Sequence, residues 1–150
     1  MKKSDRIESF VADLHVDGAR FDKCYLGYFV LFNSGRYYEA HDVLEHLWLE
    51  ETGPDHAFFK GLIQIAGAFV HLKKQYERPD HPVDGRRLHP AARLFALGVK
   101  NIQPFQPIHM GLDVAGLCRL AECLASEISD TGFQSNPWSP TNRPQLKVGW

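Results

Sequence analysis

A short stretch, EAHDVLEHLW at residues 39–48, concentrates imidazole and carboxylate side chains. On a helix, His41 and Glu45 stand one turn apart, beside Trp48, at the border of the apolar face. This pairing could help to bind a divalent metal such as zinc or iron, or Glu45 could orient His41 for acid–base chemistry. A third interpretation is a buried hydrogen-bond network that only fixes how helices pack.

A second predicted helix supplies partners for this stretch. The segment from about Asp55 to Tyr76 is apolar almost all round, which indicates an enclosed helix. Gln64 and His71 share one face of it, among small residues, and buried polar groups need partners. Because a short turn joins this helix to the preceding one, we expect antiparallel contact between the two. The expected result is a polar pocket formed by His41, Glu45, Gln64 and His71.

The predicted site follows from that pocket, with Trp48 at its border. The residues expected to hold a divalent metal are His41, Glu45 and His71. No H-E-x-x-H motif and no E-x-x-H pair of the di-iron type is present, so the identity of the metal is not specified. No nucleophile is placed beside the pocket, so catalytic residues are not assigned and the sequence leaves open whether the protein is an enzyme. On the opposite side of the same helix, Asp42 and His46 are expected to form an exposed pair.

Length, charge and cysteine content indicate which broad class of protein the chain belongs to. The chain has 150 residues, 44% hydrophobic and 23% charged, which suits one globular domain over residues 1–150. Its 17 basic and 18 acidic residues give a net charge of -1, which argues against nucleic acid as a partner. Neither a membrane span nor a secretory signal is expected. Three cysteines without C-x-x-C spacing favour a reduced, cytoplasmic protein.

Helical periodicity dominates the chain and predicts an all-α bundle of about five or six helices. Residues 77–90, with three prolines, are expected to form a loop, and residues 131–150 an extended tail lying against the body through Trp138, Leu146 and Trp150. A weakly amphipathic segment is expected to end near Gly18. The stronger predicted helices span residues 20–32, 36–50, 55–76, 90–102 and 113–129.

Three stretches carry a family resemblance: FNSGRYYEAHDVLEHLW, FFKGLIQIAGAFVHL and PFQPIHMGLDVAG. Together they resemble the Domain of Unknown Function 309 family over about residues 25–128. Asp42 stands where the family usually has a second glutamate, and the loop 77–90 looks longer than the family's turn. The resemblance implies an all-helical fold and no particular activity. It also adds Glu39 to the expected ligand-binding residues, or gives it the role of bracing the turn at residues 33–35.

Two functions from different classes are therefore expected. In the first, the protein binds a small molecule or a divalent metal in the pocket, through the residues Glu39, His41, Glu45, Trp48, Gln64 and His71. In the second, it is a non-enzymatic helical interaction module or homodimer, and the motif residues are structural. The exposure of His41 and Glu45 distinguishes the two, because a ligand site must open into a cleft whereas a structural network is sealed.

Overall fold

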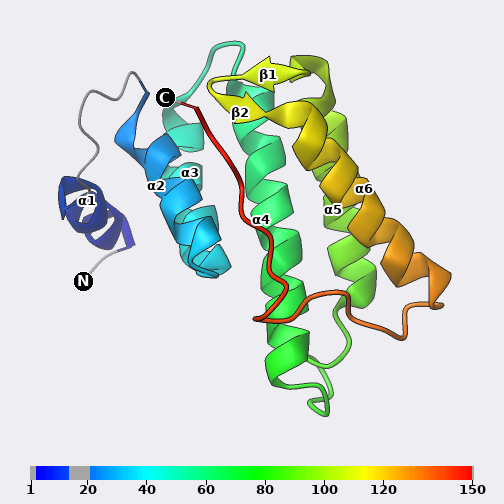
Figure 1. The fold of residues 1–150 in the computed structure, drawn as a ribbon. Helices are drawn as coiled ribbons and strands as arrows, with labels where there is room; N and C mark the ends of the chain where they lie inside the picture. Colours follow the sequence, from blue (N-terminus) through cyan, green and yellow to red (C-terminus); the bar gives the residue numbers. More distant parts are fainter. Residues whose placement is uncertain (1–2, 14–20, 150) are drawn as a thin grey trace.

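The computed structural model describes residues 3–13 and 21–149, and over these residues the chain is a helical bundle with an extended C-terminal tail (Figure 1). The fold class predicted from the sequence is therefore confirmed. Gly18 and Trp150, named in the predictions above, lie outside the described residues. The elements are α1 (Lys3–Asp13), α2 (Lys23–Asn33), α3 (Tyr37–Glu50), α4 (His56–Glu77), α5 (Leu88–Ile102), a 3-10 helix (Gln103–Phe105), β1 (Ile108–His109), β2 (Leu112–Asp113) and α6 (Val114–Asp130).

Helix boundaries follow local chemistry. The Asp22 side chain caps α2 by accepting a hydrogen bond from the backbone N–H of Cys24 at 2.7 Å. After α2 ends, Gly35 adopts a φ of 77°, which glycine reaches without a Cβ clash, and the chain reverses into α3. Asp113 caps α6 by accepting from the Gly116 N–H at 2.9 Å.

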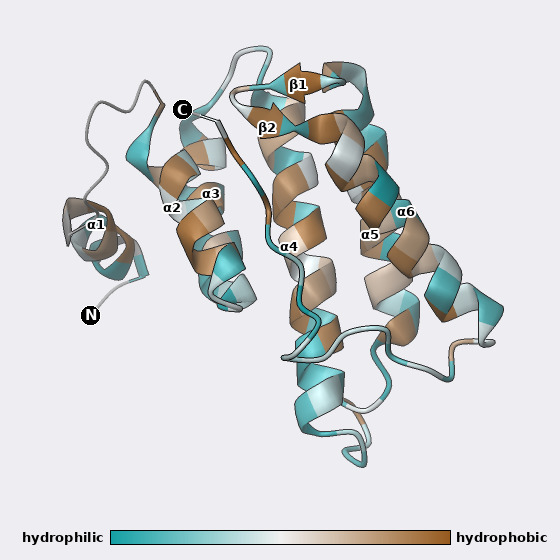
Figure 2. Ribbon diagram, viewed as in Figure 1, coloured by the Kyte–Doolittle hydropathy of each residue, from teal (hydrophilic) through white to brown (hydrophobic). Residues whose placement is uncertain are grey.

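The long helix α4 lies at the centre, with α2 and α3 on one side and α5 and α6 on the other (Figure 1). Apolar residues predominate along its middle (Figure 2). A Cβ added at Gly61 would meet Ile102 Cγ2 at 2.5 Å and the Gly98 carbonyl oxygen at 2.8 Å. The small residues of α4 therefore admit a close neighbour, as predicted, but at Gly61 that neighbour is α5 rather than α3.

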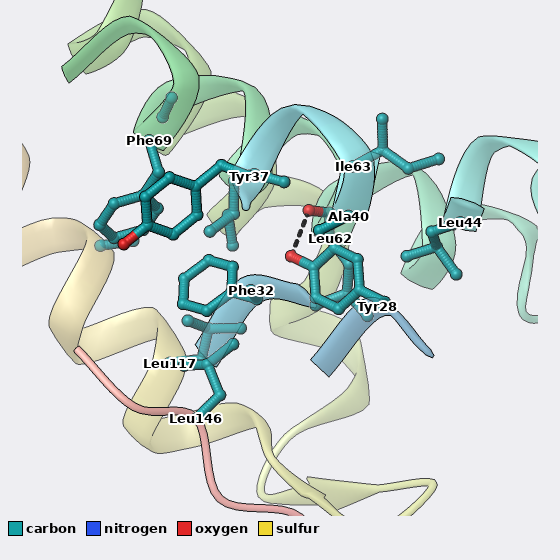
Figure 3. Packing of buried hydrophobic residues seen from close by; sticks show 14 of the residues in the cluster. Tyr28, Phe32, Tyr37, Ala40, Leu44, Leu62, Ile63, Phe69, Leu117 and Leu146 are labelled. Atoms are coloured by element: carbon teal, nitrogen blue, oxygen red, sulfur yellow. Dashed lines mark hydrogen bonds between the residues drawn. The ribbon is translucent and has the colours of Figure 1, made fainter. Parts of the chain in front are cut away.

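Aromatic side chains fill the space where α2, α3 and α4 meet (Figure 3). The Phe32 ring lies edge-on to Tyr37 and to Phe69, with ring centroids 5.0 Å apart in both pairs. The hydroxyl of Tyr28, on α2, donates a hydrogen bond to the Leu62 carbonyl of α4 at 2.7 Å. These buried contacts fix α2 and α3 against α4.

The tail after α6 returns across the bundle toward the small sheet, alongside α4 in Figure 1. Leu146 and Asn33 exchange two hydrogen bonds, one from the Leu146 N–H to Asn33 Oδ1 at 2.7 Å and one from Asn33 Nδ2 to the Leu146 carbonyl at 2.9 Å. Trp138 Nε1 donates to the Tyr37 hydroxyl at 3.0 Å. The predicted docking of Trp138 and Leu146 is confirmed, since both are buried. The β1–β2 hairpin was not predicted, because two-residue strands leave no periodic pattern.

Candidate functional site

Gln64 does not face α3. Its side-chain oxygen accepts a hydrogen bond from Asn101 Nδ2, on α5, at 2.7 Å. The amide of Gln64 therefore belongs to the contact between α4 and α5, which the Gly61 approach brings close together. Residues 64 and 101 could not be paired from the sequence, because they are far apart in the chain and only the packing of α4 on α5 brings them together.

His71 also finds its partner away from α3. Arg87, at the end of the loop between α4 and α5, places Nη1 3.0 Å from His71 Nδ1 and donates from Nε to Asp84 Oδ1 at 3.0 Å. The backbone N–H of Arg87 donates to Gln75 at 2.7 Å. Burial, reinforced by the positive charges of Arg87 and Lys74, lowers the pKa of His71. Protonation of His71 is thus disfavoured within a network that closes this loop onto α4.

Glu45 turns toward α1, whereas His41 contacts Asp42 on its own helix. Glu45 accepts a hydrogen bond from the ammonium group of Lys3 at 2.8 Å, and the same ammonium lies 3.2 Å from Asp42. His41 Nδ1 lies 3.1 Å from Asp42 Oδ1. The bond from Glu45, with a further contribution from Asp42, raises the pKa of Lys3. The predicted pairing of Asp42 with His46 is replaced by the contacts to Lys3 and His41.

The pocket predicted between the second and third strong helices is therefore not formed. Two of its four members, Gln64 and His71, bond to residues on and just before α5, whereas Glu45 bonds to α1. Within residues 3–13 and 21–149, no three His, Cys, Asp or Glu side chains are grouped so as to hold a metal ion. A ligand contact by any single one of these residues stays a prediction, but the shared geometry on which the metal site depended was wrong.

Trp48 and Glu39 complete the predicted set. Trp48 stacks on His56 with ring centroids 4.8 Å apart, and its Nε1 is buried without a hydrogen-bond partner. Glu39 pairs with Arg36 at the start of α3, beside the turn at residues 33–35. Glu39 also lines two hollows, one of about 300 Å³ next to α1 and one of about 160 Å³ between α3 and α4.

Helix α3, which carries the stretch at residues 39–48, borders a groove that α1 occupies. We call it the α2–α3 groove and define it by its lining residues Cys24, Gly27 and Leu31 of α2 and Val43 and Leu47 of α3. The apolar face of α1 fills it through Ile7, Phe10 and Val11.

The fit of α1 in the α2–α3 groove is specific at one point and incomplete around it. A Cβ added at Gly27 would lie 2.8 Å from the Phe10 ring, so glycine makes the seat for that ring. Hollows of about 300, 230 and 410 Å³ remain along the flanks of α1. Sequence reasoning missed this contact because the apolar spacing of α1 does not tell which helices it packs against, and its ion-pair residue, Lys3, carries no signal of its own.

The groove has the chemistry of a binding surface. Its floor is apolar, and its polar rim includes Asp42 and Glu45, which Lys3 contacts from α1. Burial raises the pKa of Cys24 to about 12, so the cysteine on its floor is a neutral thiol rather than a nucleophilic thiolate.

No helix in the described part of the chain is both long and apolar enough to cross a membrane.

Comparison with known proteins gives a family and no function. The family model described as Domain of unknown function (DUF309) matches residues 25–79, which run from α2 through α4. No curated protein and no solved structure is significantly similar to the chain. The matched region holds the first two of the three stretches on which the resemblance was based, and the α2–α3 groove lies within it apart from Cys24. Residues 25–79 therefore match the DUF309 family, as the sequence motifs predicted.

Proposed function

We propose that this protein is a non-enzymatic helical interaction module whose α2–α3 groove binds an amphipathic helix. The observation that carries the proposal is the seat of α1, which places an apolar helix face in the groove and one ammonium group on its acidic rim. This is the helix-in-groove mode of recognition, in which a few apolar anchors at helical spacing supply the affinity. Ile7, Phe10 and Val11 have that spacing.

The alternative function, a ligand or metal pocket between α3 and α4, has lost its geometric basis. The polar side chains that would have lined it are instead used to hold helices together, Gln64 and His71 toward α5 and Glu45 toward α1. Motif residues such as Tyr37 have structural contacts as well, since the Tyr37 hydroxyl accepts a hydrogen bond from Trp138. These contacts support the interaction-module interpretation.

The test supplies α1 as a separate peptide. The full-length chain carrying Phe10→Asp has a weakened α1 of its own, which leaves its groove accessible. A fluorescently labelled peptide of residues 3–13 should bind this variant with a Kd on the order of 100 μM, because an 11-residue helix must also be ordered on binding. Fluorescence anisotropy measures this binding.

Two matched controls sharpen the result. The same peptide carrying Phe10→Asp should bind at least about tenfold more weakly, because its main anchor is lost. Adding Gly27→Leu to the chain should abolish binding of the original peptide, since the new side chain occupies the seat of the Phe10 ring. Equal binding of the two peptides, or no binding of either to the Phe10→Asp chain, would show that the groove does not recognise this helix.

A further inference from the structure

The loop of residues 78–87, which joins α4 to α5 beyond the end of α4 in Figure 1, is organised around Asp84. Asp84 is the only buried charged residue in the described part of the chain. Its two oxygens accept hydrogen bonds from Arg78 Nη1 at 2.9 Å and from Arg87 Nε at 3.0 Å. These bonds tie the loop to itself, and the Arg87 side chain extends from it to α4.

Arg87 joins the loop to His71 through a hydrogen bond whose direction is fixed. Its Nη1 lies 3.0 Å from His71 Nδ1. An arginine guanidinium keeps its charge in proteins and can only donate, so Nδ1 must offer its lone pair. A proton on Nδ1 would replace that acceptor by a second donor. The bond between Arg87 and His71 therefore exists only while His71 is neutral.

The charges around His71 act in the same direction. Burial lowers its pKa, and the nearby positive charges of Arg87 and Lys74 lower it further. The carboxylate of this network, Asp84, bonds to Arg87. That bond lowers the pKa of Asp84, so this carboxylate stays ionised in the range where histidines titrate. A proton on His71 would thus add a positive charge beside two cations.

We infer that Arg87 and His71 form an acid-sensitive latch: when His71 takes up a proton, the Arg87 side chain leaves it and residues 81–86 detach from α4 while the helices stay folded. The backbone limits the movement at the start of α5. The N–H of Arg87 donates to Gln75 of α4 at 2.7 Å, a bond that no proton uptake removes, and Leu88 is buried. The segment that moves therefore lies between the end of α4 and Arg87.

A second histidine lies within the loop and has a different role. His81 Nδ1 accepts hydrogen bonds from the N–H groups of Val83 at 3.1 Å and Asp84 at 3.0 Å, and lies 3.9 Å from Asp84 Oδ2. Both bonds stay within the loop. Protonation of His81 would remove them but strengthen the attraction to Asp84, two effects of opposite sign. His81 shapes the loop, whereas His71 holds it on the helix.

The experiment follows the ¹⁵N-labelled full-length protein by NMR as the pH is lowered, for as long as its helical circular dichroism is unchanged. The ring nitrogens of His71 report its tautomer and its protonation. Relaxation of the Asp84, Gly85 and Arg86 amides reports the loop. Their order parameters should fall from about 0.85 to below about 0.6 as His71 becomes protonated. The two midpoints should coincide below pH 6.5, the ordinary value for histidine.

Three variants identify the titrating group. His71→Gln keeps an acceptor for Arg87 without titrating, so the loop should stay ordered over the whole range. His81→Asn keeps an acceptor within the loop and should leave the transition unchanged. Arg87→Met removes the latch and should give mobile loop amides already at neutral pH.

Three outcomes would overturn the latch. One is a loop that stays ordered after His71 has become protonated. Another is a transition that disappears in His81→Asn and persists in His71→Gln. The third is loss of the helices together with the loop or before it, because the latch requires a local opening within the folded protein.

Discussion

The contact between α4 and α5 and the contact between α1 and the α2–α3 groove are built in opposite ways. At the first, Gly61 and Gly98 bring two backbones so close that a Cβ on either would fall within 2.5 Å of an isoleucine side chain. At the second, Gly27 leaves room for the Phe10 ring, and hollows of several hundred Å³ remain beside α1. The first contact is a closed interior, whereas the second leaves room for something else.

Polar side chains follow the same division. Gln64 and His71 on α4 each have a side-chain partner on or just before α5. On α1, the Lys3 side chain is 47% exposed although it touches two carboxylates. A binding function is therefore easier to place at the loosely packed end of the molecule than at the tightly packed one.

The largest expected effect concerns the close contact. Gly61→Ala should lower the free energy of unfolding by about 2 kcal/mol, because the new methyl meets Ile102 and the Gly98 carbonyl. Gly67→Ala, on the same helix, is the matched control. Its methyl would lie 3.2 Å from the end of Leu94, which can shift, and alanine gains about 1 kcal/mol of helix propensity, so little net change is expected. Urea unfolding measures both, and equal losses would show that the contact is not special.

An intermediate effect is expected from acidification. Because the pKa of His71 is lowered in the folded protein, the unfolded chain takes up a proton as the pH falls through 6.5 while the folded protein excludes it. Stability should therefore be complete above pH 6.5 and decline below it, until the folded His71 is also protonated. His71→Gln keeps an acceptor for Arg87 without titrating, so its unfolding free energy should fall less between pH 7.5 and about 5.5. Identical pH profiles would contradict this assignment.

The smallest effect is expected at α1. Lys3→Gln removes ion pairs to Asp42 and Glu45 from a largely exposed site, where such pairs contribute about 0.5 kcal/mol. The loss should shrink further in 0.5 M salt, because exposed charges are screened. Urea unfolding at low and high salt gives both values. A loss as large as that of Gly61→Ala would show that α1 is as firmly integrated as α5, which would remove the contrast between the two regions.

Much of the fold could be predicted because its signals are local. Helical spacing of apolar residues located the helices from α2 to α6. The residues at helix boundaries, such as Gly35 after α2 and Asp113 before α6, act within one turn of the chain. The candidate site could not be predicted in the same way. Which face of α4 meets α3 and which meets α5 depends on packing between distant segments, and the prediction assigned Gln64 and His71 to the wrong neighbour.

The amino-acid sequence alone determined an all-helical chain, the central apolar helix and the motif within residues 25–79 that matches the DUF309 family. These properties depend on the spacing and type of residues over a few helical turns, and such local patterns do not depend on which distant segments pack together. Only the tertiary structure decided the partners of the polar side chains and the seat of α1. A hydrogen bond such as that from Asn101 to Gln64 requires two atoms from distant segments to lie within about 3 Å, and only the packed chain fixes that distance.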